Sequence, residues 1–261
     1  MDLGLKDQVV IVTGGAAGIG EAITRLCLQE GARVVVVNRA SDECSALIDE
    51  MKISGARCDF FEAELSDSNQ CERAVRYVES RYGTLLGLVN NAGVNDGVGL
   101  ENGTPERFLT SLHQNLVHYY AIAHYALPML KASRGSIVNI SSKVAFTGQG
   151  GTSGYAAAKG GQLALTREWA AELASFGVRV NAVVPAEVMT PLYKRWISLR
   201  DDPEKALSEI RQRIPLGHRM TEPTEIAAMV LFLLSPTQSA HTTGQQIVVD
   251  GGYTHLDRAL T

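Results

Sequence analysis

Short apolar runs rich in valine and isoleucine alternate with longer segments of helical period along the whole chain. The apolar runs cover residues 9–12, 34–37, 87–89, 136–140, 179–184 and 247–249. Between the first three of these runs, two segments at about 20–30 and 42–54 show helical period. Strands that are apolar throughout and separated by helices are typical of a parallel sheet covered on both faces. We therefore predict an α/β fold with a doubly wound parallel sheet.

One segment, at about 190–214, departs from this alternation. It is a helical insertion directly after a predicted strand, and it carries Tyr193 and Trp196. Insertions beyond strand ends commonly carry function, so we expect a lid over a substrate site. Because no Pro/Ser-rich linker and no internal repeat divides the chain, we predict a single domain over 1–261.

The composition excludes several classes of protein. Hydrophobic residues make up 45% of the chain and charged residues 20%, as in ordinary soluble globular proteins. A formal net charge of -4 without a basic stripe argues against nucleic-acid binding. No apolar run reaches the roughly 18 residues of a membrane span, and the first strand starts too early to leave room for a signal peptide. The cysteines form no CxxC pair, so we expect no metal site and a cytoplasmic protein with reduced thiols.

A glycine-rich turn follows the first predicted strand and leads directly into a helix. Residues 13–20 have the pattern T-G-x-x-x-G-x-G. Glycines at such a turn let the backbone bend tightly and approach a pyrophosphate held at the helix N-terminus. The alternative is that the glycines only ease packing between the strand and the helix. The position after the first strand favours a dinucleotide site.

The end of the second predicted strand bears on the choice of cofactor. An acidic residue at this position would bind the ribose 2′-hydroxyl of NAD, but the chain has Asn38 followed by Arg39. No carboxylate repels a 2′-phosphate there, and a guanidinium is placed to bind one. We therefore expect NADP in preference to NAD. The alternative is that Arg39 is an ordinary surface residue.

Tyr155 and Lys159 are the candidate catalytic pair. Their i, i+4 spacing places both side chains on one helix face, near the N-terminal end of that helix. A free tyrosine has a pKa near ~10, and lowering it to near 7 takes about 4 kcal/mol of preferential stabilisation of the phenolate. A nearby ammonium group and the positive end of a helix dipole both act in that direction. We predict that Tyr155 is the base and that Lys159 activates it.

Three motifs together resemble those of the short-chain dehydrogenase/reductase superfamily. They are T-G-x-x-x-G-x-G at 13–20, N-N-A-G at 90–93 and Y-x-x-x-K at 155–159. The resemblance covers essentially the whole chain. It implies a Rossmann domain with a parallel seven-stranded sheet and helices on both faces. It also implies a nicotinamide-dependent oxidoreductase acting on a CH–OH group.

The resemblance assigns roles to further residues. Ser142, at the usual separation upstream of Tyr155, would hold the reacting oxygen of the substrate. Asn115 corresponds to a helix asparagine that anchors a water relaying protons through Lys159, which also binds the nicotinamide ribose. Glu64 and Leu65 stand where the superfamily usually has Asp-Val against the adenine. The full set of expected cofactor contacts is Gly14, Ala17, Gly18, Ile19, Asn38, Arg39, Glu64, Leu65, Asn91, Ala92, Gly93, Tyr155, Lys159, Val188 and Thr190.

Polar and aromatic residues flank the predicted catalytic residues. Besides Ser142 and Tyr155, the expected substrate contacts are Asn95, Lys143, Gln149, Glu187 and Trp196. A steroid or acyl-chain pocket would be mostly apolar. Hydrogen-bonding groups of both charge signs beside an aromatic surface suit a polyhydroxylated ring instead. The alternative is that several of these side chains point to solvent.

A closer resemblance is to the bacterial L-fucose dehydrogenases of this superfamily. It is carried by residues 93–97, 118–121, 141–143, 147–150, 152–155, 185–193 and 250–258. It implies transfer of a hydride from C1 of an aldose such as L-fucose to the cofactor, giving the lactone. It also implies a homotetramer or homodimer, in which His255 and the C-terminal tail could reach a neighbouring site.

Two other functions remain open. One is an NADPH-dependent reductase of ketones or 3-oxoacyl thioesters on the same scaffold. The other is a non-catalytic nucleotide-sensing protein, which should lack part of the set Asn115, Ser142, Tyr155 and Lys159, whereas this chain has all four. The six histidines are scattered singly, and we predict neither a catalytic nor a metal-binding role for them.

Overall fold

Seven parallel strands form the central sheet of the protein, in a computed structural model that describes residues 1–256. Their order across the sheet is β3-β2-β1-β4-β5-β6-β7, and every neighbouring pair is parallel. This confirms the predicted fold class. The strands are β1 (Val9–Thr13), β2 (Arg33–Asn38), β3 (Cys58–Glu62), β4 (Gly87–Asn90), β5 (Ser136–Ile140), β6 (Arg179–Pro185) and β7 (Gln246–Val249).

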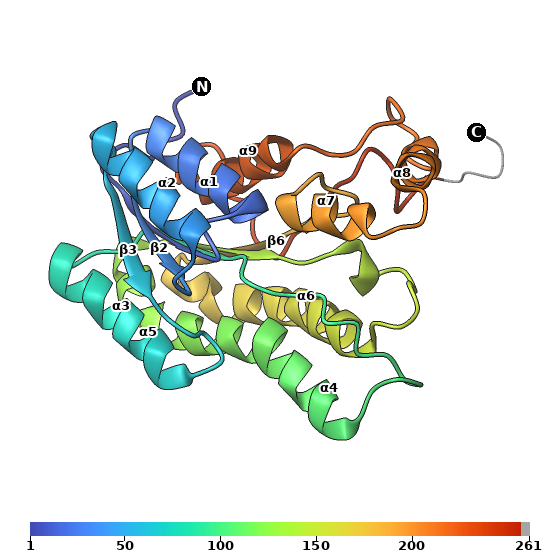
Figure 1. Ribbon diagram of the computed structural model, residues 1–261. Helices are drawn as coiled ribbons and strands as arrows, with labels where there is room; N and C mark the ends of the chain where they lie inside the picture. Colours follow the sequence, from blue (N-terminus) through green and yellow to red (C-terminus); the bar gives the residue numbers. More distant parts are fainter. Residues whose placement is uncertain (257–261) are drawn as a thin grey trace.

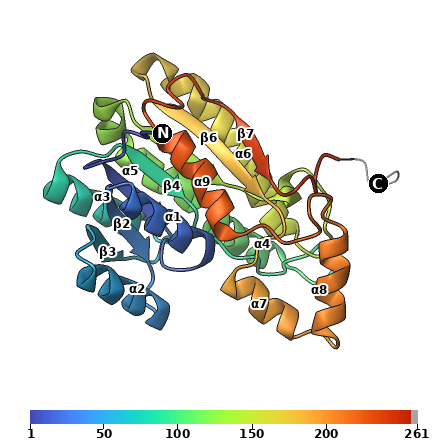
Figure 2. The ribbon, with the colours of Figure 1, turned by 90° about the horizontal axis from the view of Figure 1, so that it is seen from above.

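Helices cover both faces of this sheet, as Figures 1 and 2 show. One face carries α1 (Gly18–Gln29), α2 (Asp42–Ile53) and α9 (Pro223–Leu234). The other carries α3 (Ser68–Tyr82), α4 (Pro105–Leu112), α5 (His118–Ser133) and α6 (Ser153–Leu173), with a short 3-10 turn at Ala174–Phe176 after α6.

The strand sequences explain why both faces are covered. Val10 and Val12 of β1 pack into the core beneath α1 and α9, whereas Val9 and Ile11 pack into the core beneath α3 and α5. Successive side chains of a strand point to opposite faces, so a strand that is apolar throughout must be buried on both sides.

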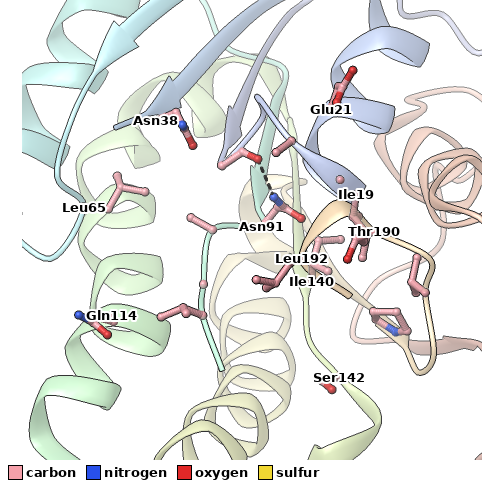
Figure 3. A pocket seen from close by; sticks show the side chains of 18 of the residues that line it. Ile19, Glu21, Asn38, Leu65, Asn91, Gln114, Ile140, Ser142, Thr190 and Leu192 are labelled. Atoms are coloured by element: carbon pink, nitrogen blue, oxygen red, sulfur yellow. Dashed lines mark hydrogen bonds between the residues drawn. The ribbon is translucent and has the colours of Figure 1, made fainter. Parts of the chain in front are cut away.

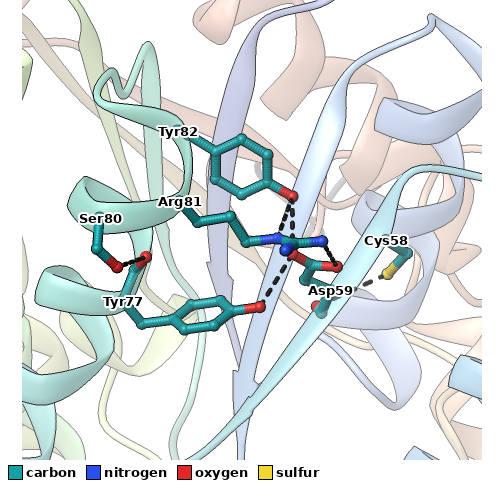
Figure 4. Close-up of polar contacts among 6 residues, drawn as sticks. All are labelled: Cys58, Asp59, Tyr77, Ser80, Arg81 and Tyr82. Atoms are coloured by element: carbon teal, nitrogen blue, oxygen red, sulfur yellow. Dashed lines mark hydrogen bonds and ion pairs between the residues drawn. The ribbon is translucent and has the colours of Figure 1, made fainter.

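The edge strand β3 was not among the runs recognised in the sequence, because Asp59 and Glu62 interrupt its apolar residues. Asp59 in this strand accepts hydrogen bonds from the hydroxyls of Tyr77 (3.0 Å) and Tyr82 (2.8 Å). It also forms an ion pair with Arg81, so three residues of α3 converge on one carboxylate (Figure 4). Polar contacts therefore help to fix this strand to its helix.

The predicted helical insertion at 190–214 is two helices. They are α7 (Pro191–Ser198) and α8 (Pro203–Gln212). Each begins with a proline, which suits the first turn because its missing N–H needs no partner there. Thr190 caps α7 and Asp202 caps α8, each accepting a hydrogen bond from a backbone N–H of the first turn. Both helices lie to one side of the sheet, beyond the ends of its strands (Figure 2).

Within residues 1–256, no helix combines the length and the apolar character that crossing a membrane requires.

Candidate active site

The glycine-rich turn between β1 and α1 packs backbone against backbone. Gly14 and Gly18 have positive φ angles of 63° and 56°, a left-handed conformation that favours glycine. A Cβ on Gly20 would lie 2.0 Å from the carbonyl oxygen of Gly14. Asn91 closes the turn, since its side-chain amide donates to the carbonyls of Thr13 (3.0 Å) and Gly14 (3.1 Å). Figure 3 shows one of these hydrogen bonds.

A cavity of about 500 Å³ opens beyond this turn, at the carboxyl ends of the strands. It lies where β1 stands between β2 and β4, which is the switch point where ligands bind in doubly wound sheets. All of the expected cofactor contacts line it: Gly14, Ala17, Gly18, Ile19, Asn38, Arg39, Glu64, Leu65, Asn91, Ala92, Gly93, Tyr155, Lys159, Val188 and Thr190. The glycine turn and this lining fit a dinucleotide.

Arg39 stands exposed at the rim of the cavity. Its guanidinium lies 3.7 Å from the Glu64 carboxylate, and its side chain is 78% exposed. An exposed ion pair of this kind contributes little stability, so the guanidinium can exchange its partner for another anion. Asn38 is turned to the backbone, because its amide donates to the Arg39 carbonyl (2.8 Å).

The candidate catalytic pair lies at the inner end of the same cavity. Tyr155 and Lys159 lie one turn apart on α6, with the Lys159 ammonium 5.4 Å from the centre of the Tyr155 ring. Ser142 also lines the cavity, just beyond the end of β5. The structure thus brings Ser142, Tyr155 and Lys159 together beside the expected cofactor residues.

Burial moves the two pKa values of this pair in opposite directions. Burial raises the pKa of Tyr155 to about 12, and the hydrogen bond with Ser142 offsets part of this rise. It lowers the pKa of Lys159 to about 7. We expected the Tyr155 pKa to fall toward 7, but the structure moves it the other way because burial penalises the phenolate. The phenolate therefore depends on stabilisation by its neighbours, which are the Ser142 hydroxyl and the Lys159 ammonium.

A π-helical turn, His113–Val117, joins α4 to α5 and buries Asn115. Turns of this type occur often at functional sites. The Asn115 side chain accepts from the Val94 N–H (2.8 Å) and donates to the Ser111 carbonyl (3.0 Å). Asn115 therefore braces the loop that follows N-N-A-G.

The connection from Asn115 to Lys159 differs from the expected one. The resemblance assigns it to a water, but in the structure the side chain of Gln162 bridges the Asn115 carbonyl oxygen and the Lys159 ammonium. Sequence reasoning missed Gln162. The available signal was an amide side chain one turn beyond Lys159, on the buried face of α6.

His118 is a second residue that sequence reasoning left without a role. Its buried ring lines the cavity, and its Nε2 is 3.0 Å from the Gln114 carbonyl. Burial lowers the pKa of His118 to about 4, so the ring is neutral at physiological pH.

The predicted substrate residues are brought together only in part. Lys143, next to Ser142, forms an ion pair with Glu187, and each side chain is only 12% exposed. The Tyr193 hydroxyl of α7 donates to Glu187 (2.7 Å), and the Lys143 ammonium lies 4.2 Å from the Tyr253 ring centre. This group joins the loop after β5, the loop after β6, the lid and the C-terminal segment.

Asn95, Gln149 and Trp196 do not line the cavity, and neither Lys143 nor Glu187 is among the residues that line it. Asn95 and Gln149 are exposed, and the Asn95 side chain accepts from the Gly97 N–H (3.3 Å) within its own loop. Trp196 is 41% exposed and packs edge-on against Tyr193, with ring centres 5.2 Å apart. A contact with substrate therefore stays a prediction for all five of these residues. The conformations of the loops between strands and helices determine where these side chains point. Residue type alone does not predict that direction.

The C-terminal segment, expected to reach a neighbouring subunit, packs in part on its own chain. The ring centre of His255 lies 5.8 Å from that of Phe146. Residues 257 and 258, which belong to the tail that carries the resemblance, lie outside the described residues.

Comparison with known proteins identifies the family. Residues 14–254 match the family model described as enoyl-(acyl carrier protein) reductase, and relatives more than 30% identical cover nearly the whole chain. The chain belongs to the short-chain dehydrogenase/reductase family. It is therefore an oxidoreductase that acts on CH–OH groups with a nicotinamide cofactor, as predicted.

Two relatives with the same identity to this chain are named for different activities. The 3-oxoacyl-[acyl-carrier-protein] reductase FabG of Thermotoga maritima is 37% identical over 95% of this chain and 98% of its own. The L-fucose dehydrogenase of Mus musculus is 37% identical over 94% of this chain and 88% of its own.

Two solved structures of the family share the fold of this chain. The Cj0485 dehydrogenase is 45% identical with a TM-score of 0.95, covering 100% of this chain and 99% of that one. The ligand-free aldohexose dehydrogenase of Thermoplasma acidophilum is 31% identical with a TM-score of 0.89, with the same coverage of both chains.

Proposed function

We propose that this short-chain dehydrogenase oxidises the C1 hydroxyl of a neutral aldopyranose such as L-fucose to the lactone. The observation that carries the proposal is the ion pair that Lys143, the residue after Ser142, forms with Glu187 next to the residues that line the cavity. A charged substrate would have to break a largely buried ion pair, and breaking such a pair is costly. The hydroxyls of a neutral sugar can bond to both partners while the pair stays intact. The relatives and the solved structure that act on sugars support the same class of substrate.

The proposed chemistry follows from the arrangement of the pocket residues. When bound, the oxidised nicotinamide supplies the acceptor for the hydride that leaves C1. Tyr155, as phenolate, takes the proton of the C1 hydroxyl, and Ser142 donates a hydrogen bond to the same oxygen. Lys159 stabilises the phenolate. The sugar loses one hydride and one proton in total, which gives the lactone.

We propose NADP as the preferred cofactor and NAD as the alternative. The support is Arg39 at the rim of the cavity, held only by an exposed contact with Glu64. A 2′-phosphate could replace that carboxylate as its partner.

A homotetramer or homodimer in the cytoplasm is the proposed state of the protein. Exposed apolar side chains at Leu109, Val117 and Tyr120, on α4 and α5 and the turn that joins them, support association through these helices. The four cysteines are all buried and unbridged, which suits a reducing compartment.

The competing function is reduction of a 3-oxoacyl thioester, because the Thermotoga reductase matches the chain as well as the fucose dehydrogenase does. To decide, purified enzyme is given NADP or NAD with L-fucose, D-arabinose or L-galactose, and formation of the reduced cofactor is followed by absorbance. We expect oxidation of at least one aldose, faster with NADP. Reduction of acetoacetyl thioester without oxidation of any aldose would overturn the proposal.

Tyr155→Phe tests whether the assigned base performs the chemistry. We expect its kcat to fall by about a thousandfold with the Kd of the cofactor nearly unchanged. Tyr120→Phe, an exposed tyrosine of α5, is the matched control and should keep wild-type activity. Wild-type activity in Tyr155→Phe would contradict the assignment, and a wild type that binds cofactor but turns over neither class would favour a nucleotide sensor.

A further inference from the structure

Gln162 occupies a fully buried position on α6, three residues after Lys159. Its amide oxygen accepts a hydrogen bond from the Lys159 ammonium at 3.3 Å. Its amide nitrogen donates to the main-chain carbonyl oxygen of Asn115 at 2.6 Å. One side chain thus connects the lysine of the catalytic pair to the π-helical turn between α4 and α5.

The surroundings allow only one orientation of this amide. Rotation by half a turn would place the amide nitrogen against the Lys159 ammonium, which has only donors. It would also place the amide oxygen against the Asn115 carbonyl oxygen, which has only lone pairs. Because both alternatives are repulsive, the oxygen of Gln162 must face Lys159.

The ammonium of Lys159 has three N–H donors. One bonds to the carbonyl of Ile140 at 2.8 Å, and a second bonds to Gln162. Both acceptors are neutral oxygens. The third donor remains for the Tyr155 side of the pocket, so the two neutral partners set the direction in which it points.

The titratable groups around Lys159 come from two helices. Tyr155 stands on α6 with it, while Tyr119 and His118 approach from α5. Strand β5 contributes only the Ile140 carbonyl to the ammonium. None of these side chains is a carboxylate. The cost of burying the ammonium is therefore offset mainly by hydrogen bonds to neutral oxygens.

We propose that Gln162 is a positioning residue for the reaction, which holds Lys159 charged and directed toward Tyr155 and anchors it to Asn115. It makes through a side chain the link that the family resemblance assigns to a water. The inference rests on the proposed role of Tyr155 as base, and it applies whichever alcohol is the substrate.

Gln162→Leu and Gln162→Glu test this role by opposite electrostatic effects. Leucine removes the acceptor and should make the charged form of Lys159 less favourable. Glutamate of nearly the same shape places a negative charge there and should make it more favourable. Gln246→Leu is the matched control, because that amide donates to the Leu163 carbonyl of the same helix (3.1 Å) without contacting Lys159.

The measurement is kcat/KM for aldose oxidation over pH 5 to 10. In Gln162→Leu, we expect the apparent pKa of the acidic limb to move down by about one unit and the plateau above it to fall about tenfold, with the rate at pH 5 nearly unchanged. In Gln162→Glu, the apparent pKa should move up. The Gln246→Leu profile should coincide with that of the wild type.

An equal loss at every pH, with no shift of the apparent pKa in either Gln162 variant, would overturn the proposal. If Gln162→Leu does not fold, the direction of the shift in Gln162→Glu decides alone. If the wild type oxidises no aldose, the proposed function fails separately. The same series is then run on acetoacetyl thioester reduction, where the rate falls as pH rises and the same opposite shifts are expected.

Discussion

The cofactor half and the substrate half of the pocket are built in different ways. The cofactor half is formed by the turn after β1 and by the ends of β2 and β4, where the course of the backbone determines much of its shape. The predicted substrate half is formed by the starts of the loops after β5 and β6 and by α7. Next to it, side chains of these loops, of α7 and of the C-terminal segment contact one another. All residues expected on the cofactor side line one cavity, whereas only Ser142 and Tyr155 among the predicted substrate contacts do.

This difference shows which kind of sequence motif determines the position of the backbone. A glycine turn between a strand and a helix has few conformations, so its spacing fixes where the backbone lies. A loop residue is free to pair with whichever neighbour folding brings to it. The two halves should therefore fail in different ways when their residues are changed.

Substitution of glycine gives the largest expected contrast. Gly20→Ala places a Cβ 2.0 Å from the Gly14 carbonyl oxygen and must displace the turn. We expect the Kd of the cofactor, measured by calorimetry, to rise by more than about 100-fold, since overpacking against backbone costs up to about 3 kcal/mol. Gly148→Ala, in the loop before Tyr155, meets no atom within 4 Å and should leave the Kd within about twofold. Equal effects would remove the distinction between the two halves.

Breaking the ion pair should affect only the substrate half. Glu187→Gln removes the carboxylate that pairs with Lys143 and weakens the contact from Tyr193. We expect kcat/KM for the sugar to fall about 30-fold, because breaking a buried ion pair costs several kcal/mol, part of which water recovers. The Kd of the cofactor should stay near the wild-type value. A comparable loss of cofactor affinity would show that the halves are coupled through the lid.

The pH dependence reports on Tyr155 and Lys159, where the two halves meet. The form that oxidises is phenolate with ammonium, which has lost one proton relative to the acid form of the pair. Because burial lowers the pKa of Lys159 to about 7 and raises that of Tyr155 to about 12, the pair loses its first proton near pH 7. Above that pH, the phenolate–ammonium form is a constant fraction of the singly protonated pair.

We therefore expect kcat/KM for oxidation to rise about tenfold per pH unit below 7 and to level off above it. Steady-state rates in buffers of constant ionic strength measure this. A continued rise to pH 10 would indicate that Tyr155 titrates independently of Lys159. Reduction should show the opposite trend, because it needs the protonated tyrosine.

The smallest effect is expected at the rim of the cavity. Arg39→Ala removes the guanidinium beside the proposed 2′-phosphate position and should weaken NADP binding by about tenfold. The affinity for NAD should change by less than about twofold, because NAD has no phosphate there. Equal changes for both cofactors would contradict NADP preference. Lys52→Ala, an exposed lysine in the last turn of α2, is the control for loss of a surface charge.

Features set by local spacing could be predicted from the sequence. The strand–helix alternation, the glycine turn and the pair Tyr155 and Lys159 all depend on neighbours within one or two turns of chain. The strand β3 was missed because its burial comes from α3, whose tyrosines cover Asp59. A pattern of apolar residues does not reveal such polar cover.

Contacts between distant segments could not be predicted. Lys143 and Glu187 were both expected to meet substrate, but the sequence does not show that they meet each other. Gln162 was missed for the same reason, because its importance depends on Asn115, which another helix supplies. The pKa of Tyr155 was expected to fall, and only the packed structure shows how strongly burial opposes this.

The helices α7 and α8, which form the predicted lid, have a consequence for how fast the enzyme can turn over. Ile197 is the one buried residue of α7, and α8 has none. Arg195 of α7 lies 3.9 Å from Glu43 of α2, in a contact whose two side chains are both mostly exposed. Little free energy therefore holds these helices in place. Their amide hydrogens should exchange with solvent long before those of the sheet, and release of product past them should be fast enough to leave hydride transfer as the slow step.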